Sequence, residues 1–172
     1  MEIIEDYAQF TTITALNWKP ILRDKNHKDI IINSLRYLAE NKRIYLYAFV
    51  IMDNHFHVIW HMRPPHTLPM IKRDFLKFTA QHLKRNLQIN QPEFLKEFEV
   101  NHADRKYQIW QRDSLSIPVF SPAIFDQKIN YIHQNPVKAG LVDVPWNYYY
   151  SSGSFYFRGK SDFDFLTHHE GE

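Results

Sequence analysis

The chain has 172 residues, of which 44% are hydrophobic and 16% aromatic, and its formal net charge is +2 at pH 7. It contains no cysteine, which excludes disulfide scaffolds, cysteine-ligated zinc and thiol catalysis. Only four glycines occur, so a glycine-rich phosphate-binding loop is excluded as well.

Length and the N-terminal stretch predict a single cytoplasmic domain. We expect one domain over residues 1–172, with a core over about 8–150 and a tail over about 151–172. The first residues, MEIIEDYAQF, lack the plan of a signal peptide, and no apolar run is long enough to cross a membrane. We therefore expect no membrane association.

Segments with strand-like and helix-like hydrophobic spacing alternate along the chain. In order, they are a strand over 10–14, a helix over 27–41, strands over 43–52 and 55–62, a helix over 68–87, a strand or hairpin over 108–120, and a helix over 122–135. This order, with one extra helix, is typical of the split βαβ pattern of ferredoxin-like folds. We predict an α+β fold with an antiparallel sheet of four to five strands, helices on one face, and a final helix that carries a tyrosine.

Helix boundaries and core faces follow from local signals. Ser121 and Pro122 are a typical helix start, and Pro136 is expected to end that helix, because the residue before a proline disfavours helical backbone. Thr67 is expected to cap the helix over 68–87. The apolar face of that helix is expected to contain Met70 or Ile71, Phe75, Phe78 and Leu87. The polar stretch over 89–107 predicts an irregular insertion with a short acidic helix.

Two histidines separated by one residue begin the strand over 55–62. Alternate strand side chains share a face, so His55 and His57 lie together, with Cβ atoms about 6–7 Å apart. Two imidazoles at that spacing can converge on one divalent ion. Two ordinary histidines on a polar sheet face would show the same pattern. The residues of the opposite face, expected in the core, are Phe56, Val58 and Trp60.

Other chemistries built on a His-x-His pair fit less well. Metallo-hydrolases with the pattern His-x-His-x-Asp-His need an acid and a histidine where this chain has Ile59 and Trp60. Histidine-triad nucleotide hydrolases need a third histidine at Ile59. His61 shares the strand face, and we expect it at the rim and not as a ligand.

The helix over 122–135 supplies the second half of a candidate site. On a helical wheel, Tyr131 and Asn135 form an i,i+4 pair on one flank of the apolar stripe, and Lys128 lies between that flank and the stripe. His133 falls on the opposite flank and is expected to be structural. A half-buried tyrosine and an asparagine at a helix end, with no role in catalysis, would give the same sequence pattern as Tyr131 and Asn135. The stripe itself contains Phe125, Ile129 and Ile132.

The motifs MDNHFHVIW and NYIHQNPVKAGLV together resemble the HUH-type single-tyrosine transposases, most closely the REP-associated tyrosine transposases. The resemblance implies a DNA endonuclease and strand transferase that cuts single-stranded DNA at hairpin-forming repeats. It implies that Tyr131 forms a 5′-phosphotyrosine and releases a 3′-hydroxyl. It further implies that His55, His57 and Asn135 hold a divalent metal ion. These three ligands leave positions open for phosphate oxygens, and a coordination shell completed by such oxygens favours Mg²⁺ or Mn²⁺.

Further roles are hypotheses from residue type and position. Lys128, one turn before Tyr131, would stabilise the phenolate or the phosphate. Basic residues on the helix over 68–87 would contact DNA phosphates, although a solvated helix face would look similar; they are Lys72, Arg73, Lys77, Lys84 and Arg85. Several aromatic residues, by contrast, would either stack unpaired bases or pack in the core; they are Trp110, Trp146 and 148–150.

Two rival functions and the oligomeric state stay open. The first rival is a hairpin-DNA-binding protein, descended from a transposase, that does not cut. The second is a metal-dependent phosphodiesterase that acts on a small nucleotide and uses water as the nucleophile. The sequence allows a monomer or a homodimer, and some members of the resembled class exchange the tyrosine helix between subunits.

Overall fold

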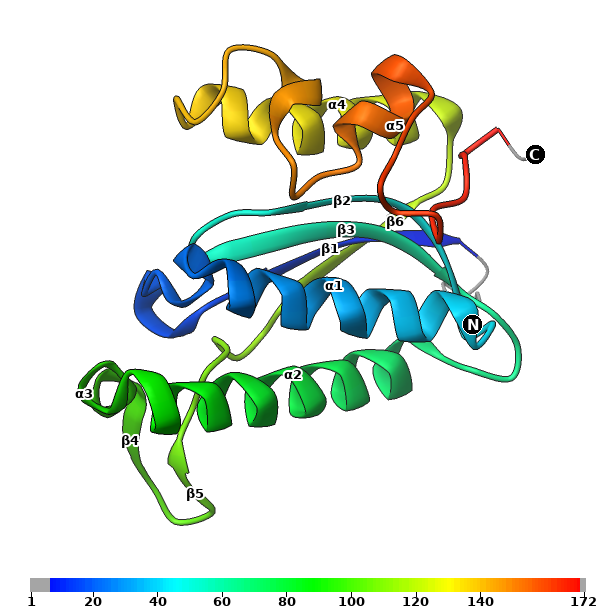
Figure 1. Ribbon diagram of the computed structural model, residues 1–172. Coiled ribbons are helices and arrows are strands. Elements are labelled where there is room, and N and C mark those ends of the chain that lie inside the picture. The colour runs from blue at the N-terminus through cyan, green and yellow to red at the C-terminus, as the bar shows by residue number, and fades with distance from the viewer. Residues whose placement is uncertain (1–6, 171–172) are drawn as a thin grey trace.

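The computed structural model describes residues 7–170 and contains a four-stranded antiparallel sheet with the strand order β2-β3-β1-β6. The strands are β1 (Ala8–Thr14), β2 (Ile44–Ile51), β3 (His55–Met62) and β6 (Leu115–Val119). Helices cover both faces of this sheet (Figure 1). The α+β prediction with an antiparallel four-stranded sheet is therefore confirmed.

The two faces of the sheet bury different side chains because successive strand residues point in opposite directions. Phe56, Val58 and Trp60 of β3 enter the larger core cluster, as predicted. His57 and Ile59 point to the other face, where a smaller apolar cluster forms. The histidine pair therefore lies on the face with the smaller core.

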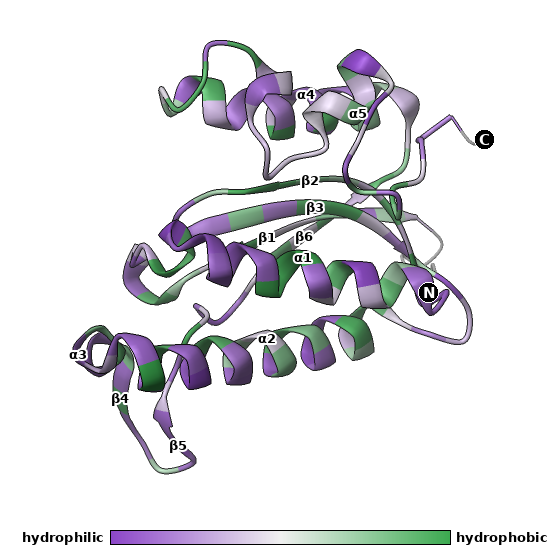
Figure 2. Ribbon diagram, in the orientation of Figure 1, coloured by the Kyte–Doolittle hydropathy of each residue, from purple (hydrophilic) through white to green (hydrophobic). Residues whose placement is uncertain are grey.

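Helices α1 (Lys25–Glu40) and α2 (Leu68–Asn90) lie on the face of the larger core, and α4 (Pro122–Lys138) lies on the opposite face (Figure 1). Hydrophobic and hydrophilic residues alternate along α1 and α2, as amphipathic helices require (Figure 2). The buried stripe of α2 recurs every four residues and contains Ile71, Phe75, Thr79, Leu83 and Leu87. The prediction was wrong for Phe78, which is 50% exposed, because it falls one position before that stripe.

One predicted helix start and one predicted helix cap need correction. Helix α1 begins two residues earlier than expected, because the Asp24 side chain accepts a hydrogen bond from the Asn26 N–H and caps it at 2.9 Å. Thr67 occupies the N-cap position of α2, but its side chain makes no capping hydrogen bond.

The predicted end of the tyrosine helix was wrong. Helix α4 continues through Pro136 to Lys138 and ends before Gly140, which has a φ of 73°. A proline inside a helix removes only one backbone hydrogen bond. Pro136 is itself buried, and the Leu141 N–H donates to its carbonyl at 3.0 Å. Packing and the left-handed glycine cap therefore set the end of the helix.

The stretch over 89–107 is more regular than predicted. After α2 come the short helix α3 (Pro92–Leu95) and a separate two-stranded hairpin of β4 (Glu99–His102) and β5 (Arg105–Tyr107). The hairpin projects beyond α2 (Figure 1). Its strands are only four and three residues long. Strands this short cannot be recognised from alternating hydrophobic and polar residues.

The C-terminal segment packs against both core clusters. Helix α5 (Gly153–Arg158) lies beside α4 (Figure 1), and Phe163 and Phe165 are buried in the larger core. The Thr167 N–H donates to the Leu46 carbonyl at 2.8 Å. Among residues 7–170, no helix is both long enough and apolar enough to span a membrane.

His133 joins α4 to the segment after it and gives the fold an acid-sensitive point. Its side chain is fully buried, and its Nε2 lies 2.8 Å from Ser152 Oγ. Burial lowers the pKa of His133 to about 4. In the unfolded chain His133 becomes protonated near pH 6.5, whereas in the folded chain it stays neutral down to about pH 4. The stability that the fold has above pH 6.5 is therefore lost as the pH falls from 6.5 to about 4.

We expect His133→Gln to lose less stability in acid than the wild-type protein. Between pH 7.5 and pH 4.5 the wild-type free energy of unfolding should fall by about 2 kcal/mol more than that of the variant. Urea unfolding at both pH values, with EDTA present, measures the difference. Equal losses in the two proteins would show that His133 is not the sensitive group.

Candidate functional site

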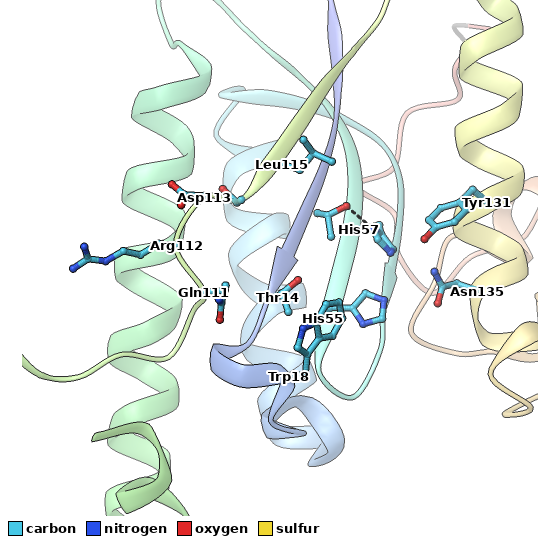
Figure 3. Close-up of a pocket in the computed structure, with 12 residues that line it drawn as sticks. Thr14, Trp18, His55, His57, Gln111, Arg112, Asp113, Leu115, Tyr131 and Asn135 are labelled. Carbon is cyan, nitrogen blue, oxygen red and sulfur yellow. Dashed lines mark hydrogen bonds between the residues drawn. The ribbon is translucent and has the colours of Figure 1, made fainter. Parts of the chain in front are cut away.

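A pocket of about 460 Å³ opens between the sheet and α4, and it collects the residues that the sequence singles out. His55 and His57 come from β3, and Tyr131 and Asn135 come from α4. All four side chains point into the space between these two elements (Figure 3). Because all four belong to the same chain, one subunit holds every member of the group.

The turn between β2 and β3 fixes the position of His55. Backbone hydrogen bonds tie this turn to the segment after β1: the Ala15 N–H donates to the Asn54 carbonyl at 2.9 Å, and the Leu22 N–H donates to the Asp53 carbonyl at 2.8 Å. Within the turn, the Met52 N–H donates to the His55 carbonyl at 2.8 Å. His55 is therefore held from two sides before any ligand binds.

An ion pair reinforces the same turn. The Lys28 ammonium, whose side chain is almost completely buried, lies 2.9 Å from Asp53 Oδ1, and Arg23 approaches the other carboxylate oxygen at 3.5 Å. Burial opposes ionisation of Asp53, but the hydrogen bonds and charges of Lys28 and Arg23 outweigh it and hold the pKa of the carboxyl below its usual range. Helix α1 therefore anchors the turn that precedes His55.

Each histidine of the pair is oriented through its Nδ1. His55 Nδ1 lies 2.7 Å from Asn54 Oδ1, and His57 Nδ1 lies 2.8 Å from Thr12 Oγ1. Because the Asn54 oxygen only accepts, His55 carries its proton on Nδ1 and leaves the Nε2 lone pair free. This is the arrangement by which proteins orient imidazole ligands of a metal ion.

The Nε2 atom of His57 is the clearest sign that something binds here. It is buried and has no hydrogen-bond partner within the described part of the chain, although a buried polar atom normally has one. Burial, the neighbouring His55 and the charge of Lys128 lower the pKa of His57 to about 3, so the ring is neutral at pH 7. In the tautomer that donates its Nδ1 proton to Thr12 Oγ1, this neutral imidazole would offer its Nε2 lone pair to a divalent metal ion.

The third donor suited to a metal ion is an amide. Within residues 7–170 there is no group of three or more His, Asp or Glu side chains that could hold a metal. The Asn135 side chain instead lines the pocket beside the two imidazoles. His55, His57 and Asn135 could together supply two nitrogens and one oxygen, which leaves coordination positions open for phosphate oxygens.

Tyr131 stands at the edge of the histidine pair. Its ring centroid lies 5.2 Å from that of His57 and 5.9 Å from that of Phe10, edge-on in both cases. The side chain is 45% exposed, so an extended ligand can reach the phenolic oxygen. A phenol beside a candidate metal site is an arrangement suited to nucleophilic attack on a phosphodiester.

The remaining histidine and lysine predictions have mixed outcomes. His133 is buried, His61 contacts Tyr45, and neither lines the pocket. The Lys128 ammonium lies 4.8 Å from the centroid of the Phe10 ring and does not line the pocket. Phe10 in turn contacts Tyr131, so Lys128 and Tyr131 share this aromatic ring as a neighbour.

The structure does not bring the predicted DNA-contacting residues of α2 to the pocket. Lys72 donates to the Ser114 carbonyl at 3.0 Å, and Arg73 pairs with Asp74 at 2.9 Å. None of the five lines the pocket: Lys72, Arg73, Lys77, Lys84 and Arg85. Of the aromatic candidates, Trp110 is buried and donates its indole N–H to Thr79, so it belongs to the core.

Two parts of the pocket wall were not predicted as site residues from the sequence. The first is the segment over 111–115, which lies across the pocket from α4 (Figure 3). The second is Trp18, an exposed side chain next to His55. The predicted strand or hairpin over 108–120 includes the first part but does not place it at the pocket, and both parts are positioned by long-range contacts that hydrophobic periodicity does not report.

Comparison with known proteins identifies the family and a similar fold. The model of the family described as "Transposase IS200 like" matches residues 10–121, which include the histidine pair but end before Tyr131. A solved structure of a REP-associated tyrosine transposase bound to a REP hairpin has a TM-score of 0.67 and 17% identity. That match covers 100% of this chain and 94% of the other.

A second solved structure, of an inferred transposase from Deinococcus radiodurans R1, has a TM-score of 0.47 and 20% identity, with 73% of this chain and 89% of the other covered. No curated protein matches the sequence. The family match spans well over half of the chain and contains both pocket histidines, and the fold agrees with that of the REP-associated transposase. The chain therefore belongs to the family of IS200-like transposases.

Proposed function

We propose that this protein cuts and rejoins single-stranded DNA at hairpin-forming repeats, with Tyr131 as the nucleophile. The observation that carries the proposal is the meeting of Tyr131, Asn135 and the pair His55 and His57 in one pocket of one chain. The family match and the likeness to a hairpin-bound transposase support it. The whole chain would act as one unit in the cytoplasm, as a monomer or a homodimer.

The proposed chemistry is a phosphoryl transfer to tyrosine. The Tyr131 hydroxyl loses its proton, and its oxygen bonds to phosphorus while the bond from phosphorus to the 3′-oxygen breaks. The 3′-oxygen takes up a proton and leaves as a 3′-hydroxyl, and the 5′-phosphate stays on Tyr131. The covalent bond conserves the phosphodiester energy, so a 3′-hydroxyl of another strand can attack it and rejoin DNA.

The pocket residues have distinct proposed roles. A divalent ion, Mg²⁺ or Mn²⁺, bound by His55, His57 and Asn135 would polarise the phosphate and neutralise its developing charge. The neutral state of His57 and the hydrogen bonds at Nδ1 of both histidines keep Nε2 available for it. The basic residues of α2 stay proposed contacts for DNA phosphates outside the pocket.

Covalent trapping tests this function. The protein is incubated with Mn²⁺ and labelled oligonucleotides that carry hairpins from the inverted repeats flanking its gene, with single-stranded arms on both sides. We expect a protein–DNA adduct that survives denaturation, a released fragment with a free 3′-hydroxyl, and no adduct with EDTA. Tight hairpin binding without an adduct across the whole set would instead indicate a non-cutting DNA-binding protein.

Asn54 should act as a positioning residue for the metal site. Asn54→Ala removes the oxygen that fixes the His55 ring, and we expect Mn²⁺ affinity to fall about 10- to 100-fold. Isothermal titration with Mn²⁺ in the absence of DNA measures it. Asn101→Ala, an exposed residue of the β4–β5 hairpin, is the matched control and should bind Mn²⁺ like the wild-type protein. Equal affinities in both variants would contradict the role.

Lys128 is proposed to stabilise the phenolate or the phosphate through its charge. Because its ammonium lies over Phe10 and outside the pocket lining, we expect Lys128→Ala to slow cleavage only about tenfold. Lys128→Arg should recover most of the rate, since it keeps the charge. Single-turnover cleavage measures both variants, and an unchanged rate and covalent yield in Lys128→Ala would remove Lys128 from the mechanism.

A further inference from the structure

Trp18 is an exposed indole at the rim of the pocket. Its side chain is 61% exposed, whereas Trp60 and Trp110 are buried and each donates its indole N–H to a threonine. Trp18 lines the same pocket as the histidine pair. A large aromatic surface kept in solvent beside a candidate active site is suited to contact a ligand.

The backbone holds Trp18 in place against its own preference. Asn17 and Trp18 have φ angles of 53° and 57°, a left-handed conformation that bulky residues adopt only when their surroundings enforce it. Gln111 accepts from the Asn17 N–H at 3.2 Å, and Asn54 donates to the Trp18 carbonyl at 3.4 Å. These contacts come from two distant segments, so the fold fixes the backbone that carries the ring at the rim.

Four aromatic rings form a row across the site. The ring centroids of Trp18 and His55 lie 5.8 Å apart, those of His55 and His57 lie 4.9 Å apart, and those of His57 and Tyr131 lie 5.2 Å apart. Trp18 therefore lies on the side of the histidines away from Tyr131, as Figure 3 shows. Asn54 contacts both the Trp18 carbonyl and the His55 ring, which couples the two positions.

We propose that Trp18 is a stacking platform for the unpaired base of the nucleotide that leaves with the 3′-hydroxyl. The inference rests on the proposed function. In phosphoryl transfer, the attacking and leaving oxygens lie on opposite sides of phosphorus. With Tyr131 attacking from α4, the leaving nucleotide lies on the Trp18 side. Stacking on an indole needs a free base face, so the substrate at this position is single-stranded, and any base can occupy it.

A cycle of protein and DNA changes tests the platform. An abasic site replaces the nucleotide on the 5′ side of the cut, and single-turnover cleavage is measured for the wild-type protein, Trp18→Ala and Trp18→Phe. We expect the abasic site to slow the wild-type protein about 5- to 100-fold. Trp18→Ala should be slowed by a similar factor on intact DNA and be insensitive to the abasic site, whereas Trp18→Phe should keep the sensitivity.

Two controls complete this test. An abasic site on the 3′ side of the cut should affect wild-type and Trp18→Ala proteins equally, and Tyr37→Ala, at an exposed aromatic of α1 outside the pocket, should behave like the wild-type protein. If Trp18→Ala keeps the full sensitivity to the 5′ abasic site, the inference is overturned.

Failure of the proposed function would look different, because the wild-type protein would then form no adduct at all. In that case the inference is decided by tryptophan fluorescence during titration with single-stranded DNA. Loss of the quenching in Trp18→Phe supports a stacking platform, and quenching equal to that of the wild-type protein overturns it.

Discussion

Replacing Tyr131 with phenylalanine should abolish the covalent adduct and lower the cleavage rate by at least about 10⁴-fold. The change removes only the phenolic oxygen, the atom proposed to bond to phosphorus. The ring contacts with Phe10 and His57 stay, and no hydrogen bond of that hydroxyl occurs within residues 7–170. Single-turnover cleavage of a labelled hairpin oligonucleotide, followed on a denaturing gel, measures the loss.

The same variant distinguishes a tyrosine transposase from a phosphodiesterase. A phosphodiesterase that uses water as the nucleophile would keep its turnover in Tyr131→Phe, whereas a tyrosine transposase would lose it. The fold of the variant should be intact, with a midpoint of thermal unfolding within about 2 °C of the wild-type value. Cleavage that survives the substitution would contradict the proposed mechanism.

Replacing His57 with alanine should lower cleavage by about 10³-fold or more, because the variant loses the buried Nε2 that fits a metal ion. His61→Ala is the matched control. His61 lies on the same strand and face, four residues further on, but does not line the pocket. Cleavage rates over a Mn²⁺ titration should be nearly flat for His57→Ala and like wild type for His61→Ala.

Two outcomes would contradict this account. Equal losses in both histidine variants would indicate a general effect of changing β3 and not the loss of a ligand. A His57→Ala variant that recovers full activity at high Mn²⁺ would show that His57 contributes affinity only. Far-ultraviolet circular dichroism on each variant keeps a folding defect from being mistaken for either outcome.

The placement of the histidine pair follows from sequence because strand periodicity is strict. Alternate residues share a face, so Phe56 and Val58 in the core require that His55 and His57 lie on the other side. Helical periodicity similarly places Tyr131 and Asn135 on one flank of α4. These local rules predict the two halves of the site separately.

How the halves meet is not a local property. Helix α4 crosses the face of the sheet that carries the histidines because Ile132 and its neighbours bury against Ala48, Val50 and Ile59, residues far away in the sequence. Trp18 escaped the sequence argument for the same reason, since its left-handed backbone depends on Gln111 and Asn54.

The end of α4 shows the limit of a local rule. A proline usually breaks a helix, but at Pro136 burial and the turn at Gly140 carry the helix one turn further. The β4–β5 hairpin shows the opposite limit, because its strands are too short to have a readable period. In both cases, tertiary contacts decide what local sequence signals leave open.

The most direct measurement is the site of attachment in the covalent adduct. The trapped complex is digested with nuclease and protease, and the modified peptide is sequenced by mass spectrometry. The account predicts a nucleotide joined through its 5′-phosphate to the peptide that contains Tyr131. A nucleotide on another side chain, such as the exposed Tyr149, or one joined through its 3′ end, would contradict it.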